Sequence, residues 1–152
     1  MASSKVANRY AQSFLDTSIE KNILDKVSSD FDFVHRSLIK SQELLRAFKS
    51  PVIKTETKQS ILVEIFGELI SKDSLDFLNF VITKGREELI AEILEKFDSL
   101  RDEHIGSVKV DVVTAFIFTD EQKTQLQQKF ESYLKKKARL TFKVDQNIIG
   151  GF

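Results

Sequence analysis

Hydrophobic residues recur every three or four positions over residues 4–104, which is the spacing of amphipathic helices. The first of these segments carries a stripe of apolar and small side chains at i, i+4 positions. The members of this stripe are Val6, Ala7, Tyr10, Ala11 and Phe14. Pro51 interrupts the pattern after a short third segment, because proline disfavours helix at the residue before it. The whole pattern predicts a bundle of about six short helices.

The fifth helical segment is apolar on nearly every side. It begins near Ser74, continues through "LDFLNFVITK" and ends at Gly85, a residue suited to a helix C-terminus. A surface helix of a globular bundle should show a single apolar stripe. This segment is therefore either the central helix of the bundle or a helix with one side left for a partner, and both interpretations stay open. The small Ala7 and Ala11 beside Tyr10 favour a partner, because they would leave a shallow trough for another helix.

At Gly106 the spacing of apolar residues changes from helical to alternating. In "SVKVDVVTAF" valine occupies every second position, as in a half-buried strand. Thr119 and Gln122 then form the sequence of a capping box that opens a helix, and "LTFKV" alternates again. The order is strand, helix, strand. Two strands joined by a crossover helix are expected to lie parallel.

The last residues contain a turn signal with almost nothing after it. Gly150 and Gly151 can adopt the positive φ values of a tight hairpin turn, and only Phe152 follows. Because a two-stranded sheet is marginal in water, we expect a third, antiparallel strand, and we expect that the sequence stops before it. The predicted fold is therefore mainly α, with a six-helix bundle over residues 1–105 and a small, truncated α/β domain over residues 106–152.

Composition narrows the classes of protein that fit. The 152 residues are 41% hydrophobic with thirteen Phe, enough for packed cores, and the absence of cysteine excludes a disulfide framework and cysteine-based chemistry. The longest charge-free stretch, "VVTAFIFT", is far shorter than the roughly 20 residues of a membrane span. Residues 1–105 hold 15 Lys and Arg against 18 Asp and Glu, a net of −3, and residues 106–152 hold 8 against 5, a net of +3. So small an asymmetry argues against a dedicated nucleic-acid binder.

Candidate catalytic and ligand-binding residues are scarce. His35 and His104 lie on separate predicted helices, with no spacing typical of a metal site or a catalytic triad. No glycine-rich phosphate-binding loop occurs. The carboxylates, as in "KGREEL" and "RDEH", lie opposite the apolar stripes, where charged residues solvate a helix. We therefore expect no catalytic residue, no cofactor and no metal site, and we do not expect an enzyme.

The basic run "KKKARLTFK", residues 135–143, is the one candidate nucleic-acid site. Its lysines could bind phosphates, and Phe142 could stack on a base. Lys135, Lys136 and Lys137 are, however, predicted to lie in the last turn of a helix, where the helix dipole favours cations. We favour this helix-end interpretation and expect no nucleic-acid partner. An RNA-binding module stays as the weaker alternative.

Several segments, taken in order, resemble a known family. They are "VANRYAQSFLD", the proline after the third helix, "FLNFVITKGREELI", "VKVDVVTAFIFTDEQ" and "FKVDQNIIGG". Together they resemble the delta subunit of bacterial ATP synthase, which in mitochondria is called the oligomycin-sensitivity-conferring protein. The resemblance spans Val6 to Gly151. It implies a six-helix N-terminal domain followed by a small α/β domain, without catalysis. Family members continue past the two glycines with further strand, whereas here only Phe152 follows.

The resemblance also implies a function and partners. Such a subunit is a stator that links the catalytic head, through the N-terminal helix of an alpha subunit, to the b subunits of the peripheral stalk. It would lie at the cytoplasmic face of the bacterial inner membrane, peripheral through the complex only, without a cofactor. In the family the alpha helix binds between the first and fifth helices. The residues carried over by motif position are Ala7, Tyr10, Ala11 and Phe14 on one wall or beneath it, and Asn79, Phe80, Ile82 and Thr83 on the other. A helical adaptor for some other amphipathic peptide is the alternative.

Overall fold

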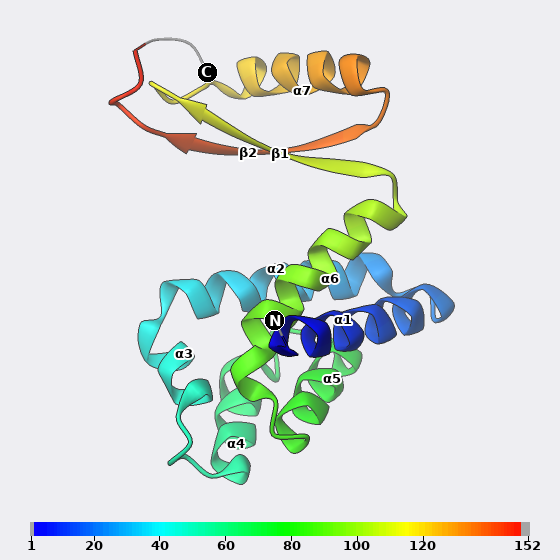
Figure 1. Ribbon diagram of the computed structural model, residues 1–152, viewed down its shortest axis with the longest axis vertical. Coiled ribbons are helices and arrows are strands. Elements are labelled where there is room, and N and C mark those ends of the chain that lie inside the picture. Colours follow the sequence, from blue (N-terminus) through cyan, green and yellow to red (C-terminus); the bar gives the residue numbers. More distant parts are fainter. Residues whose placement is uncertain (1, 150–152) are drawn as a thin grey trace. The chain divides into compact units, whose positions relative to one another are not determined.

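The computed structural model describes residues 2–149, and these form a mainly helical chain with a small parallel sheet (Figure 1). The helices up to His104 are α1 (Ala2–Glu20), α2 (Leu24–Lys40), α3 (Gln42–Lys49), α4 (Thr55–Phe66), α5 (Lys72–Thr83), the short 3₁₀ helix η1 (Glu87–Leu89) and α6 (Ile90–His104). The elements that follow are β1 (Ser107–Thr114), α7 (Asp120–Leu134) and β2 (Lys137–Val144). The mainly helical fold class predicted from apolar spacing is confirmed.

The chain divides into two compact units within α6. The first unit ends at Leu100 and the second begins at Arg101. The last turn of α6 belongs with the strands because Asp102, a buried carboxylate, lies 3.1 Å from the guanidinium of Arg139 on β2. The change of apolar spacing at Gly106 marks the end of helix and the start of strand, whereas the two compact units divide six residues earlier, after Leu100. The predicted domain division between residues 105 and 106 stays a prediction.

Four phenylalanines from four helices form the centre of the helical unit. Phe14 of α1 stacks on Phe77 of α5, with ring centres 4.1 Å apart, and lies 5.3 Å from Phe31 of α2. Phe97 of α6 contacts Phe31 edge-on at 4.8 Å. Because Phe14, Phe31 and Phe97 are buried, these rings hold α1, α2, α5 and α6 to one another.

The start of α5 is held by a buried carboxylate that sequence reasoning did not expect. Asp30 on α2 is only 3% exposed, and it accepts hydrogen bonds from the Ser71 amide, the Ser71 hydroxyl and the Ser74 hydroxyl. Lys26, one turn earlier on α2, donates to the same carboxylate at 2.8 Å. Burial by itself raises the pKa of Asp30, but the hydrogen bonds from Lys26, Ser71 and Ser74 outweigh it, so the pKa lies below its ordinary value.

The two strands lie parallel, as the strand, helix, strand order predicted, with Ser107 opposite Lys137 and Thr114 opposite Val144. Between them α7 opens with the predicted capping box, in which the Thr119 hydroxyl accepts from the Gln122 amide and the Gln122 side chain accepts from the Thr119 amide. The two-glycine turn at residues 150–151 and Phe152 lie outside the described residues.

The end of α7 differs from the prediction. Lys135, Lys136 and Lys137 were predicted in its last turn, but the helix ends at Leu134 and the prediction is wrong. Lys135 adopts the left-handed conformation that terminates a helix, with φ of 51°, although such a position favours glycine. Lys137 already pairs with Ser107 in the sheet, so strand pairing, and not the helix dipole, determines its conformation.

Candidate functional site

Helices α1 and α5 lie side by side and run in opposite directions. Contacts join α1 and Lys21, the residue directly after it, to α5 at three levels, and they pair later positions of the first segment with earlier residues of α5. In order along the seam, they are Lys21–Asp73 with 2.6 Å between charged atoms, Phe14–Phe77 with ring centres 4.1 Å apart, and Tyr10–Phe80 with ring centres 6.1 Å apart. The structure therefore brings together the two helices that the resemblance pointed to.

The eight predicted partner-binding residues separate into a buried group and a surface group. The buried group, at 8% exposure or less, consists of Ala7, Ala11, Phe14 and Ile82. The surface group consists of Tyr10 and Asn79, which are half-buried, and Phe80 and Thr83, which are exposed. The trough expected above Ala7 and Ala11 is covered by the protein's own atoms, because both residues are fully buried. Only the surface group is accessible from outside the molecule in this structure.

The two interpretations of the fifth helix both describe part of it. Leu78, Val81 and Ile82 are fully buried, as in a central helix. Phe80, between them in sequence, keeps 48% of its surface exposed, so α5 also presents an aromatic ring outward. Lys84 lies with its ammonium 5.3 Å from the centre of this ring. The exposed side of α5 therefore combines an apolar ring with a neighbouring cation.

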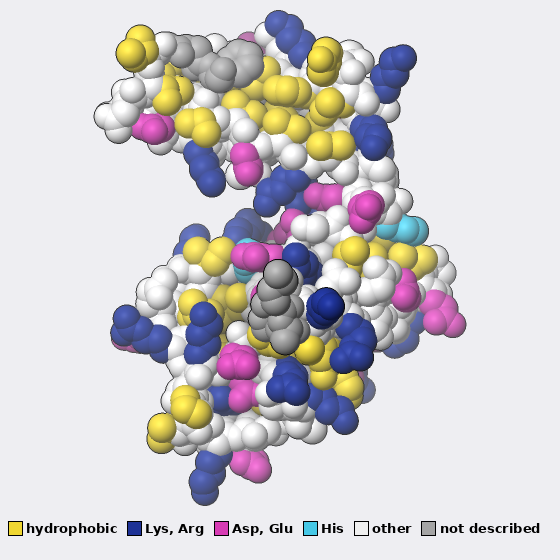
Figure 2. All heavy atoms as spheres, viewed as in Figure 1, with side chains coloured by type: hydrophobic (Ala, Val, Ile, Leu, Met, Phe, Trp, Pro, Cys, Tyr) yellow, Lys and Arg dark blue, Asp and Glu magenta, His cyan; other side chains and the backbone are white. Residues whose placement is uncertain are grey.

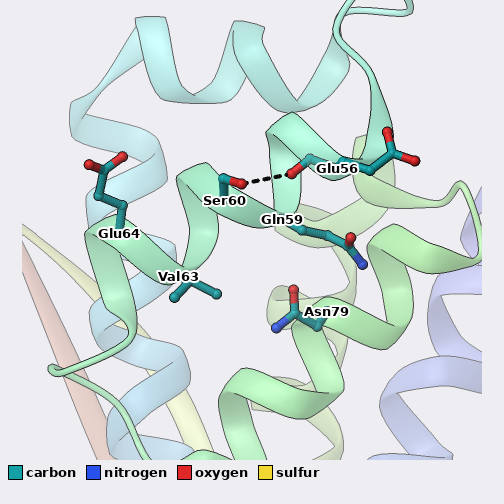
Figure 3. A pocket seen from close by; sticks show the side chains of 6 residues that line it. All are labelled: Glu56, Gln59, Ser60, Val63, Glu64 and Asn79. Atoms are coloured by element: carbon teal, nitrogen blue, oxygen red, sulfur yellow. Dashed lines mark hydrogen bonds between the residues drawn. The ribbon is translucent and has the colours of Figure 1, made fainter.

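A hollow of about 820 Å³ lies between α4 and α5 (Figure 3). Figure 3 shows Gln59, Val63 and Asn79 turned toward the space between the two helices. The residues that line the hollow are Glu56, Gln59, Ser60, Val63, Glu64 and Asn79. Gln59 also donates a hydrogen bond of 3.0 Å to the Thr83 hydroxyl, which links α4 to the end of α5. Of these lining residues, only Asn79 was among the residues predicted from the sequence.

One signal for α4 was present in the sequence. Val63 lies off the apolar stripe of its helix, next to Leu62 on that stripe, and it is 48% exposed in the structure. An apolar residue off the stripe is a common surface feature, so by itself it does not indicate a site. Only the placement of α5 beside α4 shows that Val63 lines the hollow between the two helices.

Residues 2–149 contain neither a cluster of side chains suited to a metal ion nor a helix suited to crossing a membrane. No group of three or more His, Asp or Glu side chains there is arranged to hold a metal ion. His35 on α2 lies 3.4 Å from the Glu95 carboxylate on α6. None of the helices in this described range is both long enough and apolar enough to cross a membrane.

Comparisons with known proteins agree on one family. The chain matches the family model described as ATP synthase delta (OSCP) subunit over residues 6–152. A relative from Chloroherpeton thalassium named ATP synthase subunit delta is 33% identical over 146 residues, covering 96% of this chain and 80% of that protein. Its namesake from Chlorobium phaeobacteroides is 35% identical over 151 residues, covering 99% and 84%.

A solved structure shares the fold. It is a chain of the cryo-EM structure of the Toxoplasma gondii mitochondrial ATP synthase hexamer, with a TM-score of 0.77 and 21% sequence identity. The match covers 93% of the present chain and 79% of the other. At this level of identity the likeness concerns the fold, and both units lie within the matched length.

Proposed function

Because this chain belongs to the ATP synthase delta (OSCP) subunit family, we propose that it is a non-catalytic stator subunit of a rotary ATP synthase. In this proposal the helices up to α6 form a six-helix N-terminal domain, which binds the N-terminal helix of an alpha subunit. The strand-containing unit is a small α/β domain that binds the b subunits of the peripheral stalk. The protein lies at the cytoplasmic face of the bacterial inner membrane through the complex only, and it needs no cofactor.

The physical task of such a subunit is restraint. A turning rotor exerts torque on the catalytic head, and the head yields useful work only if it is held still. A link with one binding site for the head and another for the stalk suits this task, because once one contact is made the other forms at high effective concentration. The division into two compact units supports two separate attachments.

The observation that carries the proposal is the aromatic pair on the seam between α1 and α5, in which Tyr10 is half-buried and Phe80 is exposed. Tyr10 and Phe80 come from different helices, and Phe80 is 48% exposed although the next two residues of α5 are fully buried. An amphipathic helix binds in this way to a surface that offers a few apolar anchors along its length. Asn79 and Thr83 add polar groups beside the pair, where they can fix the orientation of a docked helix.

The test is a titration of the full chain with a peptide of the alpha subunit N-terminal helix from the same organism. Phe80→Asp should weaken binding by at least about tenfold, because a charge then replaces an apolar anchor of the interface. Phe116→Asp is the matched control, since Phe116 is similarly exposed at 54% but lies in the strand-containing unit. Circular dichroism of each variant establishes that it is folded. Equal affinity of folded Phe80→Asp and the wild type would reject this surface.

A further inference from the structure

The parallel pairing of β1 and β2 divides their side chains between two faces. One face packs against α7, where Val112, Thr114 and Ala138 are buried together with Leu126 of the helix. The other face, which we call the open face, carries the alternate residues of both strands. These residues are Ser107, Lys109, Asp111 and Val113 of β1 and Lys137, Arg139, Thr141 and Lys143 of β2. None of the eight is buried.

The open face is basic. Lys109, Lys137 and Lys143 are exposed, and no ion pair joins any of them to another residue in the part of the chain that the structure describes. Arg139 pairs with Asp102, a carboxylate that also pairs with Arg101. Asp111 is the only acidic residue among the eight. The open face therefore carries more basic than acidic side chains. Figure 2 shows dark blue and magenta side chains together on the side of this unit away from α7.

The composition of the open face decides among possible occupants. A second copy of the same face would bring lysines against lysines, which is unfavourable. Single-stranded nucleic acid would need aromatic side chains for base stacking, and Phe142 instead lies on the α7 side, 5.8 Å from the Lys123 ammonium. A lipid surface would need apolar side chains that insert, and only Val113 is offered. An acidic polypeptide can form ion pairs with the lysines and needs neither stacking aromatic side chains nor inserting apolar ones.

We propose that the open face of the β1–β2 sheet docks an acidic helix of the stalk polypeptide. This inference rests on the proposed stalk attachment and names its surface. Lys137 and Lys143 are six residues apart on β2, so their Cα atoms are separated by about 20 Å along the strand. A helix covers the same distance in about 13 residues. The partner helix therefore carries carboxylates about four turns apart on one side, with polar or small residues over Thr141 and Val113 between them.

The experiment measures binding of the full chain to the soluble part of the b subunits from the same organism. The test variant is Lys109→Gln/Lys137→Gln/Lys143→Gln. The control variant Lys5→Gln/Lys40→Gln/Lys49→Gln changes the net charge equally at exposed lysines of the helical unit. We expect the test variant to bind about tenfold more weakly and the control to bind as the wild type does, because each of three exposed charge pairs contributes a factor of about two. The difference should shrink in high salt.

The possible results separate the inference from the proposed function. Equal affinity of the folded test variant and the wild type would overturn the open face while leaving the stalk attachment in place. No binding of the b subunits by the wild type, with the alpha peptide still bound, would overturn the stalk attachment itself. A single-stranded RNA of 20 nucleotides is the third probe. Tight, salt-sensitive RNA binding that only the test variant loses, with b binding unchanged, would assign the face to nucleic acid and overturn the inference.

Discussion

Asp30 shows how one residue can fix the geometry of a helix pair. Its carboxylate accepts from the amide of Ser71 and from the hydroxyls of Ser71 and Ser74, so a side chain on α2 binds the first turn of α5. A negative charge at a helix N-terminus is favoured by the helix dipole, and hydrogen bonds to a charged acceptor are stronger than neutral ones. The site that α5 presents therefore depends on a residue far from it in the sequence.

Replacing this carboxylate should make stability less sensitive to acid. Because the pKa of Asp30 is lowered on folding, the ionised group stabilises the native state above its unfolded pKa, and this contribution is lost as pH falls through the folded pKa. Asp30→Asn should therefore lower the free energy of unfolding by about 2 kcal/mol at pH 7, and by progressively less as the pH falls below the ordinary carboxyl pKa of about 4. Urea denaturation at a series of pH values measures this.

Asp32→Asn is the control for that experiment, because Asp32 lies on the same helix and its side chain is half-buried but outside the Ser71 and Ser74 contacts. The difference in free energy of unfolding between Asp32→Asn and the wild type should be about the same at each pH. A loss in Asp30→Asn that is as large at pH 3 as at pH 7 would show that the charge of Asp30 is not what stabilises the contact.

At the scale of elements, the seam between α1 and α5 depends on the phenylalanine cluster beneath it. Phe14→Ala should lower the free energy of unfolding by about 3–5 kcal/mol, because it leaves a cavity against Phe77, Phe31 and Phe97. Phe33→Ala is the control, since Phe33 on α2 is 38% exposed and its loss should cost much less. Denaturation by urea compares the two. Equal losses would mean that the four rings do not form the centre of the unit.

Local signals predicted some elements well and others poorly. The capping box at Thr119 and Gln122 was predicted because both partners lie within four residues. The end of α7 was not, because Lys135 adopts a left-handed conformation and Lys137 is bound to a strand 30 positions earlier in the chain. The exposure of the Phe80 ring could not be predicted for the same reason. Its exposure follows from how α1 and α4 flank α5, which no window of sequence contains.

At the scale of the whole molecule, two units with separate cores should lose structure separately. Thr119→Ala removes the side-chain cap of α7 and should cost about 1 kcal/mol, felt only in the strand-containing unit. Hydrogen exchange should then quicken roughly fivefold for the amides of β1 and β2, while those of α1 and α5 keep their rates. Equal acceleration in both units would show that they open as one.

The candidate site was predictable from the sequence only as a family property. The order of the motifs pointed to the first and fifth helices, and the structure does place α1 and α5 side by side. The individual residues were beyond this reasoning, because Ala7 and Ile82 share the apolar character of Phe80 yet are fully buried. Burial depends on distant contacts, so sequence pattern could not separate the exposed residues from the buried ones. The α4 side of the hollow was missed for the same reason.

The most direct test of the central claim is a photo-cross-linking measurement in the assembled ATP synthase of the same organism. Phe80 is replaced by p-benzoylphenylalanine, and in a matched control Phe33 on α2 is replaced instead, since it too is a partly exposed phenylalanine of the helical unit. The account predicts that position 80 forms a cross-link to the N-terminal segment of an alpha subunit and that position 33 does not. A cross-link to alpha from position 33, with none from position 80, would contradict it.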